Sequence, residues 1–428
     1  MDKIIINKLN EVIYHETLDN GLDVYIYKKS GFNKKTANFV TKYGSYNYEF
    51  IPSGKNKIKK FPKGIAHFLE HKLFESSDNQ NIFSKFEKYG ASVNAFTNYN
   101  ETCYYFICSE NFNECLNLLL DFVQTPFFTD ENVEKEKGII KQEIDMWDDN
   151  INEAIYQRQL ENVLFKNPRK YSITGEKKDV EAITKDDLYE CYNTFYNPNN
   201  MILTISGDVD VEETLHIIKE NQSKKQFDKL TNLSFPLYDE KKEVVRTYEN
   251  IIKNVSSPRL NICYKLLVSR LTKKELFKRK LFLSLFFEMK FGSTTGFKKT
   301  LINDKIIKSV FGANFYCFDD VILMTFNGDI INKERFIKII DEKLKETTFD
   351  EKIFELVKKA YIASMVRAFD NPSGIANKIY NDIIKNGELT DYAYEEYQKF
   401  TFNEFLNQVK ELNFDNKSVI YVTNHKEE

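Results

Sequence analysis

Residues 67–71 read His67-Phe68-Leu69-Glu70-His71, and the interpretation of the whole chain starts from this pentapeptide. The segment around it, from Ile65 to about Glu75, has a helical pattern and follows a loop rich in Gly, Lys and Pro. On a helix, side chains at positions i, i+3 and i+4 share a face, so both imidazoles and the carboxylate project toward one point. Zinc binds two neutral imidazole nitrogens in this arrangement and keeps room for a third protein ligand and a water molecule.

Glu70 is adjacent to both candidate ligands but is not needed as one, so its carboxylate is available to accept the proton of that water. The order His-x-x-Glu-His is that of the inverted zincins. A solvated helix face is the plain alternative, because a Glu beside a His is common on exposed helices. The pentapeptide also provides only two imidazoles, so a metal site requires a third ligand from elsewhere in the chain.

Candidates for the third ligand lie on an acidic helix predicted from Asp130 through Asp148. Glu136 and Glu143 are seven residues apart, which is two helical turns, so they line one face while the isoleucines between them can face the core. Acidic residues on a helix most often face solvent, and this reading competes with the metal site. The presence of the His-x-x-Glu-His helix favours the metal site.

Together these segments resemble the pitrilysin and insulysin family of zinc peptidases, which includes the mitochondrial processing peptidases. The family pattern is His-x-x-Glu-His followed by a helix that reads Glu-[Lys/Arg]-x-x-hydrophobic-x-x-Glu, and here the last Glu is Glu143, 72 residues after His71. The resemblance implies one Zn²⁺ per chain held by His67, His71 and Glu143. It also implies that Glu70 is the general base and that Glu136 supports the site without binding the metal.

A second feature of the resemblance is the segment Asn94-Ala95-Phe96-Thr97. It is similar to the family's edge strand beside the metal, on which a substrate peptide adds as an extra strand. Asn94 is the polar exception in an apolar run. Its side chain is expected to bond the substrate backbone, and a satisfied turn or buried amide is the alternative.

The chain reads as two copies of one plan of strands and helices. Thr129-Asp130-Glu131 opens a long helix and has an echo in Phe349-Asp350-Glu351, and Asp-Asn pairs at 149–150 and 370–371 end the two helices. No Gly-rich βα turn of a dinucleotide fold separates strand from helix, so the predicted class is α+β. We expect two homologous α+β halves, each with a mixed or antiparallel sheet covered by helices: residues 1–218 with the zinc site, a polar linker at 219–244, and residues 245–428 without a metal site.

Composition excludes several classes of protein. The 428 residues carry 61 basic and 64 acidic side chains, and this net charge of −3 argues against a nucleic-acid binder. No apolar stretch is long enough for a membrane span, and no signal peptide is apparent. Six cysteines without a CxxC pair predict buried, reduced thiols. These observations predict a cytoplasmic protein.

The predicted function is a zinc endopeptidase, and the family resemblance implies that it cleaves short or unfolded peptides inside a dimeric chamber. A non-catalytic peptide-binding or scaffold subunit of the same fold is the alternative, although such relatives usually lack a ligand or the base. A metal-stabilised structural domain is a third possibility, but it would need four protein ligands.

The resemblance also predicts something that this chain lacks. Short family members carry in the second half a Gly/Ser-rich loop and a helix with an Arg, followed seven residues later by a Tyr, and both hold the substrate backbone. Ile302 stands at the Arg position and Ser309 at the Tyr position. Isoleucine has no donor and the serine hydroxyl is too short. We therefore expect a heterodimer in which a metal-free homologue supplies the Arg and Tyr, with a homodimer as the alternative.

Overall fold

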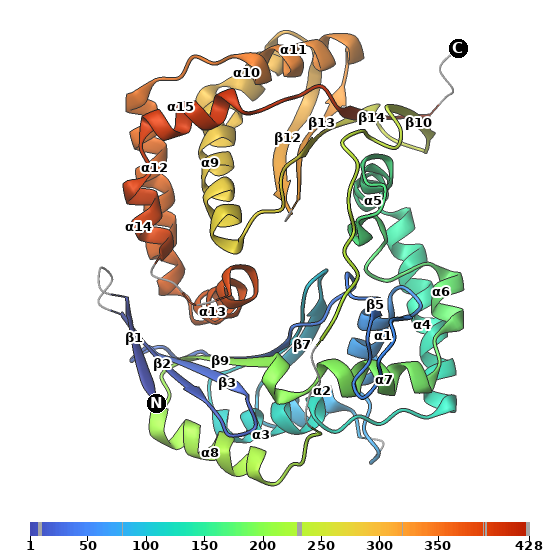
Figure 1. The fold of residues 1–428 in the computed structure, drawn as a ribbon, viewed down its shortest axis with the longest axis vertical. Helices are drawn as coiled ribbons and strands as arrows, with labels where there is room; N and C mark the ends of the chain where they lie inside the picture. The colour runs from blue at the N-terminus through green and yellow to red at the C-terminus, as the bar shows by residue number, and fades with distance from the viewer. Residues whose placement is uncertain are drawn as a thin grey trace. The chain divides into compact units, whose positions relative to one another are not determined.

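The computed structural model describes residues 1–6, 11–78, 80–228, 233–318, 320–387, 389 and 392–424. The chain folds into two compact units, each built on one sheet covered by helices (Figure 1). The first unit contains Met1–Asp149, Tyr171–Leu237 and Val366–Asp391, and the second contains Asn150–Lys170, Tyr238–Met365 and Tyr392–Glu428. This architecture confirms the predicted α+β class.

The sheet of the first unit has seven strands in the order β1-β2-β3-β9-β4-β8-β7. In that order, the strands span Asp2–Ile6, Glu11–Thr17, Asp23–Lys28, Met201–Gly207, Lys35–Thr41, Thr102–Cys108 and Ser92–Thr97. A separate two-stranded sheet pairs β5 (Glu49–Phe50) with β6 (Lys59–Lys60). Only the β3–β9 pair is parallel among the described pairs of the seven-stranded sheet. The order leaves β7 at an edge, as the sequence predicts for this segment.

Helices cover both faces of this sheet. On one face the apolar side chains of β3, β4, β8 and β9 form a large core with a group of helices: α1 (Ile65–Lys72), α2 (Ile82–Glu87), α3 (Phe112–Val123), α4 (Asp130–Asp149), α6 (Lys177–Ala182), α7 (Lys185–Phe195) and α8 (Val211–Ser223). Because successive side chains of a strand point to opposite faces of the sheet, Tyr27 and Val40 are buried on the other face. There they pack against Ile375 and Ile379 of α13 (Pro372–Asn386).

The second unit has a five-stranded sheet in the order β10-β14-β11-β13-β12. The strands are Tyr248–Ile252, Lys417–Thr423, Arg259–Leu267, Val321–Ile330 and Ile307–Cys317 in that order. A phenylalanine-rich core joins one face to α9 (Lys273–Phe291), α10 (Phe297–Asn303), α11 (Lys333–Lys345), α12 (Glu351–Arg367), α14 (Tyr392–Lys399) and α15 (Phe402–Lys410). Ile420 and Val422 pack on the other face against Ile155 of α5 (Ile151–Val163).

The linear division into residues 1–218 and 245–428 is wrong for two segments, because each unit takes one helical segment from the other half of the sequence. The exchanged helices α5 and α13 both begin directly after an Asp-Asn pair. The side chain of Asn150 accepts the backbone N–H of Asn152 at 3.1 Å, and that of Asn371 accepts the backbone N–H of Ser373 at 3.1 Å. The two Asp-Asn pairs are therefore matching helix caps. The first lies where the chain enters the second unit, and the second lies shortly after the chain returns to the first unit at Val366.

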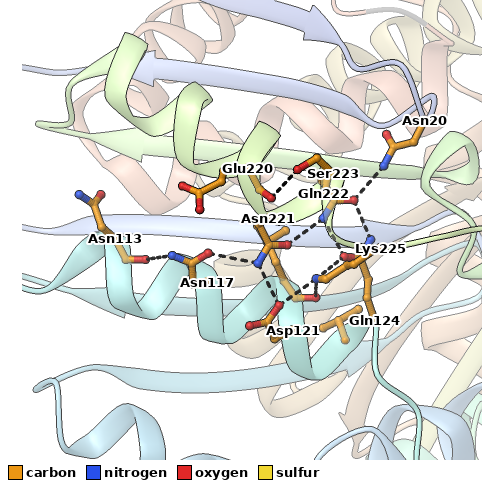
Figure 2. A network of polar contacts seen from close by, with 12 residues as sticks. Asn20, Asn113, Asn117, Asp121, Gln124, Glu220, Asn221, Gln222, Ser223 and Lys225 are labelled. Carbon is orange, nitrogen blue, oxygen red and sulfur yellow. Dashed lines mark hydrogen bonds and ion pairs between the residues drawn. The ribbon is translucent and has the colours of Figure 1, made fainter.

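The predicted linker 219–244 is also structured at its start. Helix α8 (Val211–Ser223) continues into this segment. Figure 2 shows that polar side chains at its end form hydrogen bonds and ion pairs with side chains of α3. Asn221 donates to Asn117 at 3.1 Å and to Asp121 at 2.9 Å, and Lys225 pairs with the same aspartate at 2.9 Å. The Asn, Gln and Lys residues that suggest a linker in the sequence form a polar contact between two helices at this point.

The end of the predicted linker is held by a buried ion pair in the second unit. The side chains of Glu240 and Lys265 are both 0% exposed, and the ammonium donates to the carboxylate at 2.9 Å. Glu240 also accepts three backbone N–H groups, from residues 165, 166 and 167, at 2.7–2.8 Å. With every charge bonded, this pair satisfies the condition under which buried ions are tolerated. It ties the segment after α5 to strand β11.

All six cysteines are buried, and none of them forms a disulfide. Among the described residues, the structure has no helix whose length and hydropathy would allow it to cross a bilayer.

Candidate metal centre

Helix α1 presents the His-x-x-Glu-His side chains. It begins after Gly64, which has φ 81°, and a Cβ at this position would lie 2.1 Å from the carbonyl oxygen of Thr174. Only glycine fits such a close approach with a left-handed backbone. The helix packs against β7 and α4, and its apolar side chains Phe68 and Leu69 are fully buried. The position of the two histidines is therefore fixed by a rigid, buried helix.

Helix α4 brings Glu143 to both histidines. Oε2 of Glu143 lies 3.7 Å from Nε2 of His67 and 3.5 Å from Nε2 of His71. Ligands at 2.0–2.1 Å from a tetrahedral zinc are about 3.3 Å apart from one another, so small adjustments bring these atoms to ligand positions. In the described part of the chain these three side chains are the one cluster of His, Cys, Asp or Glu that could hold a metal ion.

The surroundings of the two histidines orient them for metal binding. Nδ1 of His71 donates to Oε1 of Glu136 at 2.9 Å, which leaves the lone pair of Nε2 directed at the cluster. Burial lowers the pKa of His67 to about 3, so this imidazole is neutral. Neutral imidazole is the form that a metal binds. Glu136, which the family resemblance predicts as a supporting residue, contacts the candidate ligand His71 and is not itself a member of the cluster.

Lys72 adds a positive charge behind this pair. Its side chain is 0% exposed and its ammonium lies 4.0 Å from Oε2 of Glu136. The same ammonium donates to the carbonyl oxygen of Asn132 at 3.0 Å and pairs with Glu75 at 2.7 Å. The buried carboxylate of Glu136 thus has a partner for each oxygen, which satisfies the requirement for a buried charge.

Glu70 is held by a residue of the predicted substrate strand. The hydroxyl of Thr97 donates to Oε2 of Glu70 at 2.6 Å, and both side chains are buried. This bond occupies one carboxylate oxygen and leaves Oε1 to accept a proton. Burial raises the pKa of Glu70, and the bond from Thr97 opposes that rise. A carboxylate in this environment is a stronger base than one in water.

The other residues of the predicted substrate strand lie along the edge strand β7. Ala95 and Phe96 are half-buried, whereas Asn94 is exposed and its Oδ1 accepts the backbone N–H of Ala95 at 2.9 Å. A cavity of about 910 Å³ adjoins the cluster, and its lining includes Glu70, His71, Asn94, Phe74, Phe83 and Phe127. The side chain of Thr97 therefore contacts the candidate base Glu70, whereas Asn94 lines the cavity.

Trp147 is a neighbour of the cluster that the sequence interpretation does not single out. Its indole Nε1 donates to Oε1 of Glu143 at 3.1 Å. The signal available in the sequence is its spacing, four residues after the predicted third ligand on the same helix.

The relationship to known proteins agrees with this geometry. The model of the insulinase family (peptidase family M16) matches residues 50–177, and the model of the M16 inactive domain matches residues 182–361. YmfH, an uncharacterized zinc protease of Bacillus subtilis, is 38% identical over 405 residues, which cover 94% of this chain and 92% of YmfH. The chain belongs to peptidase family M16.

Solved structures agree with this assignment. An M16-like peptidase from Alicyclobacillus acidocaldarius is 30% identical, has a TM-score of 0.90, and is matched over 96% of this chain and 97% of its own. A protease from Helicobacter pylori, at 18% identity and a TM-score of 0.82, shares the fold over 96% of this chain and 99% of its own. The resemblance drawn from the sequence is thereby confirmed. All the candidate metal-site residues from His67 to Glu143 lie inside the segment matched by the insulinase family model.

Proposed function

We infer that this M16 chain is a zinc-dependent endopeptidase that cleaves short or unfolded peptides, as the catalytic subunit of a dimer. The convergence of His67 Nε2, His71 Nε2 and Glu143 Oε2 beside a buried, hydrogen-bonded Glu70 is the observation that carries this proposal. The donor set, two imidazoles and one carboxylate, is one that zinc takes in catalytic sites, where a further position stays open.

The mechanism assigns a separate task to each residue. When bound by His67, His71 and Glu143, zinc supplies a Lewis acid beside the scissile carbonyl. Glu70 takes one proton from the attacking water through Oε1 as the new C–O bond forms. It then gives that proton to the nitrogen of the leaving amine as the C–N bond breaks. Glu136 holds the ring of His71 in place throughout.

The edge strand β7 supports the proposal that the substrate binds in extended form. An edge strand offers unpaired backbone groups to an added strand, and β7 lies next to α1 and the cavity. Asn94 masks one such group by accepting the N–H of Ala95. Its amide would have to turn away when a peptide adds, and could then bond the substrate backbone.

Thr97→Val tests the positioning of the base. Valine keeps the shape of the side chain but removes the donor to Glu70, and a hydrogen bond to a charged group contributes about 1.5–3 kcal/mol. We expect kcat to fall by about 10–100-fold with little change in KM, and Thr97→Ser to retain most of the rate. Steady-state kinetics on a fluorogenic peptide, with zinc content measured in parallel, gives the answer. A valine variant with the wild-type kcat would contradict this role for Thr97.

A non-catalytic peptide-binding or scaffold subunit remains the second candidate, because the model of the M16 inactive domain matches residues 182–361. That segment lies outside the metal centre, and the cluster, the base and its partner Thr97 are all present in the first unit. A structural zinc site would need a fourth protein ligand, and the described residues supply three. Both points favour the enzyme.

The proposed second subunit is a metal-free homologue that supplies the Arg and Tyr missing here. Ile302 lies on α10, and the hydroxyl of Ser309 on β12 donates to Asp329 at 2.8 Å, so neither side chain offers a donor to a substrate. One relative, from Caenorhabditis elegans, is named mitochondrial-processing peptidase subunit beta and is 29% identical over 165 residues, 38% of this chain and 36% of that protein. Its name describes one subunit of an assembly, which supports the heterodimer.

Mixing the purified chain with a metal-free homologue of the same family tests both parts of the proposal. We expect the chain alone to bind about one zinc but to cleave test peptides poorly, and the homologue to raise kcat/KM by about 10²-fold or more, because it supplies the orienting groups. His67→Ala is the control, since it should lose zinc and stay inactive in the mixture. Full activity of the chain by itself would favour the homodimer, and the absence of zinc would refute the peptidase.

A further inference from the structure

The last turn of α4 carries a side chain that core packing does not explain. Residues 145–150 are all exposed, so no side chain after Ile144 is held by burial in a core. Trp147 nevertheless stands on this turn, 41% exposed, and it is the one tryptophan of the 428-residue sequence. Its hydrogen bond, and not burial in a core, is therefore the contact that can explain this tryptophan.

That contact is with a candidate metal ligand. Trp147 and Glu143 are in the i, i+4 relation that places side chains together on a helix, and the indole N–H donates to Oε1 of Glu143 at 3.1 Å. The other oxygen, Oε2, lies 3.7 Å and 3.5 Å from the Nε2 atoms of the two histidines. The two oxygens of this carboxylate thus face different partners.

We propose that Trp147 is a positioning residue of the metal centre, whose indole N–H holds Oε1 of Glu143 so that Oε2 alone is presented as a zinc ligand. This inference rests on the proposed function, because it needs zinc at the cluster. A carboxylate that is free to rotate can offer either oxygen or both. An oxygen that already accepts a hydrogen bond is a weaker donor to a metal, and its partner fixes the rotation of the group.

The choice of tryptophan fits this task. An indole N–H can donate but cannot accept, so it orients the carboxylate without offering the metal a competing nitrogen or oxygen. A histidine or an acidic residue at this position would bring a fourth donor to the cluster. One ligand oxygen in place of two also keeps a coordination position open, which distinguishes catalytic from structural zinc sites.

Zinc affinity, measured by competition with a chelating dye, tests the proposal without reference to hydrolysis. Trp147→Phe keeps an aromatic ring but removes the donor, and we expect its zinc Kd to rise by about 10-fold, since such outer partners contribute about 10–100-fold. Trp147→Gln restores a donor at the i+4 position and should stay within about threefold of wild type. Met146→Leu is the matched control on the same exposed turn, with wild-type affinity expected.

The thermal midpoint of the metal-free protein separates positioning from a structural role. Because the turn contains no buried residue, the three variants should melt with the wild type before zinc is added. A Phe variant with wild-type zinc affinity would overturn the proposal. A Gln variant that binds zinc more weakly than the Phe variant would also overturn it, because packing of the aromatic ring would then be the important property. If the wild-type chain bound no zinc, the proposed function itself would fail, and that result is distinct from either of these.

Discussion

Glu70→Gln should retain zinc and lose hydrolysis. The amide cannot accept a proton from the attacking water, and removal of a general base typically costs about 10²–10⁴ in rate. The loss should lie toward the upper end of that range, because the same group returns the proton to the leaving amine. The measurement is kcat with the partner subunit present, together with zinc content by atomic emission.

Two features of the structure make this substitution informative. Glutamine keeps the volume of the buried side chain, and its carbonyl oxygen can still accept the hydroxyl of Thr97, which lies 2.6 Å from Oε2 of Glu70 in the native protein. The metal ligands are on other side chains, so the cluster stays intact. Hydrolysis at the wild-type rate by a zinc-loaded Glu70→Gln enzyme would rule out the proposed base.

Periodicity was sufficient to locate most of the elements that build the site. The predicted helical segments at 65–75 and 130–148 correspond to α1 and α4, and the predicted edge strand at Asn94–Thr97 lies in β7. These segments have one buried face and one exposed face, so their apolar residues recur at the period of the element. The same argument places both histidines of α1 and the carboxylate of Glu70 on one side of the helix.

Where periodicity is weak, the prediction is less complete. Strand β12 begins at Ile307, but its next residues are exposed and its pairing with β13 is irregular between Ile307 and Phe311, so no alternation of apolar residues marks its start. The exchanged helices are a different case. An amphipathic helix such as α5 shows that it must cover an apolar surface, but nothing in its own sequence says which of two similar sheets provides it.

The site shows the same limit at the level of single residues. The spacing of residues along a helix identifies the candidate ligands, because that spacing decides which side chains lie on the same face. The contact of Thr97 with Glu70 depends on how β7 packs beside α1, which no local pattern records. Thr97 was therefore grouped with the substrate strand, and the structure places its hydroxyl on the base.

The two acids of α4 should respond differently to the same change. Glu143→Gln replaces the carboxylate oxygen that faces both histidines with a neutral amide oxygen, so zinc affinity should fall strongly. Glu136→Gln should weaken zinc binding less, by about 10–100-fold, because glutamine can still accept the Nδ1–H of His71 and keep its tautomer. Glu134→Gln, on the exposed side of the same helix, is the matched control and should bind zinc as the wild type does.

The residual effect of Glu136→Gln has its own physical cause. Glu136 raises the pKa of His71 against the effect of burial, and it lies near the buried ammonium of Lys72 at 4.0 Å. Its loss would make His71 a less basic ligand and leave the charge of Lys72 balanced by Glu75 alone among its ion-pair partners. We therefore expect lower activity and a small loss of thermal stability with much of the zinc still bound. Zinc titrations that show the reverse order, with Glu136→Gln releasing the metal and Glu143→Gln retaining it, would exchange the roles of the two residues and remove the basis for the assigned ligand set.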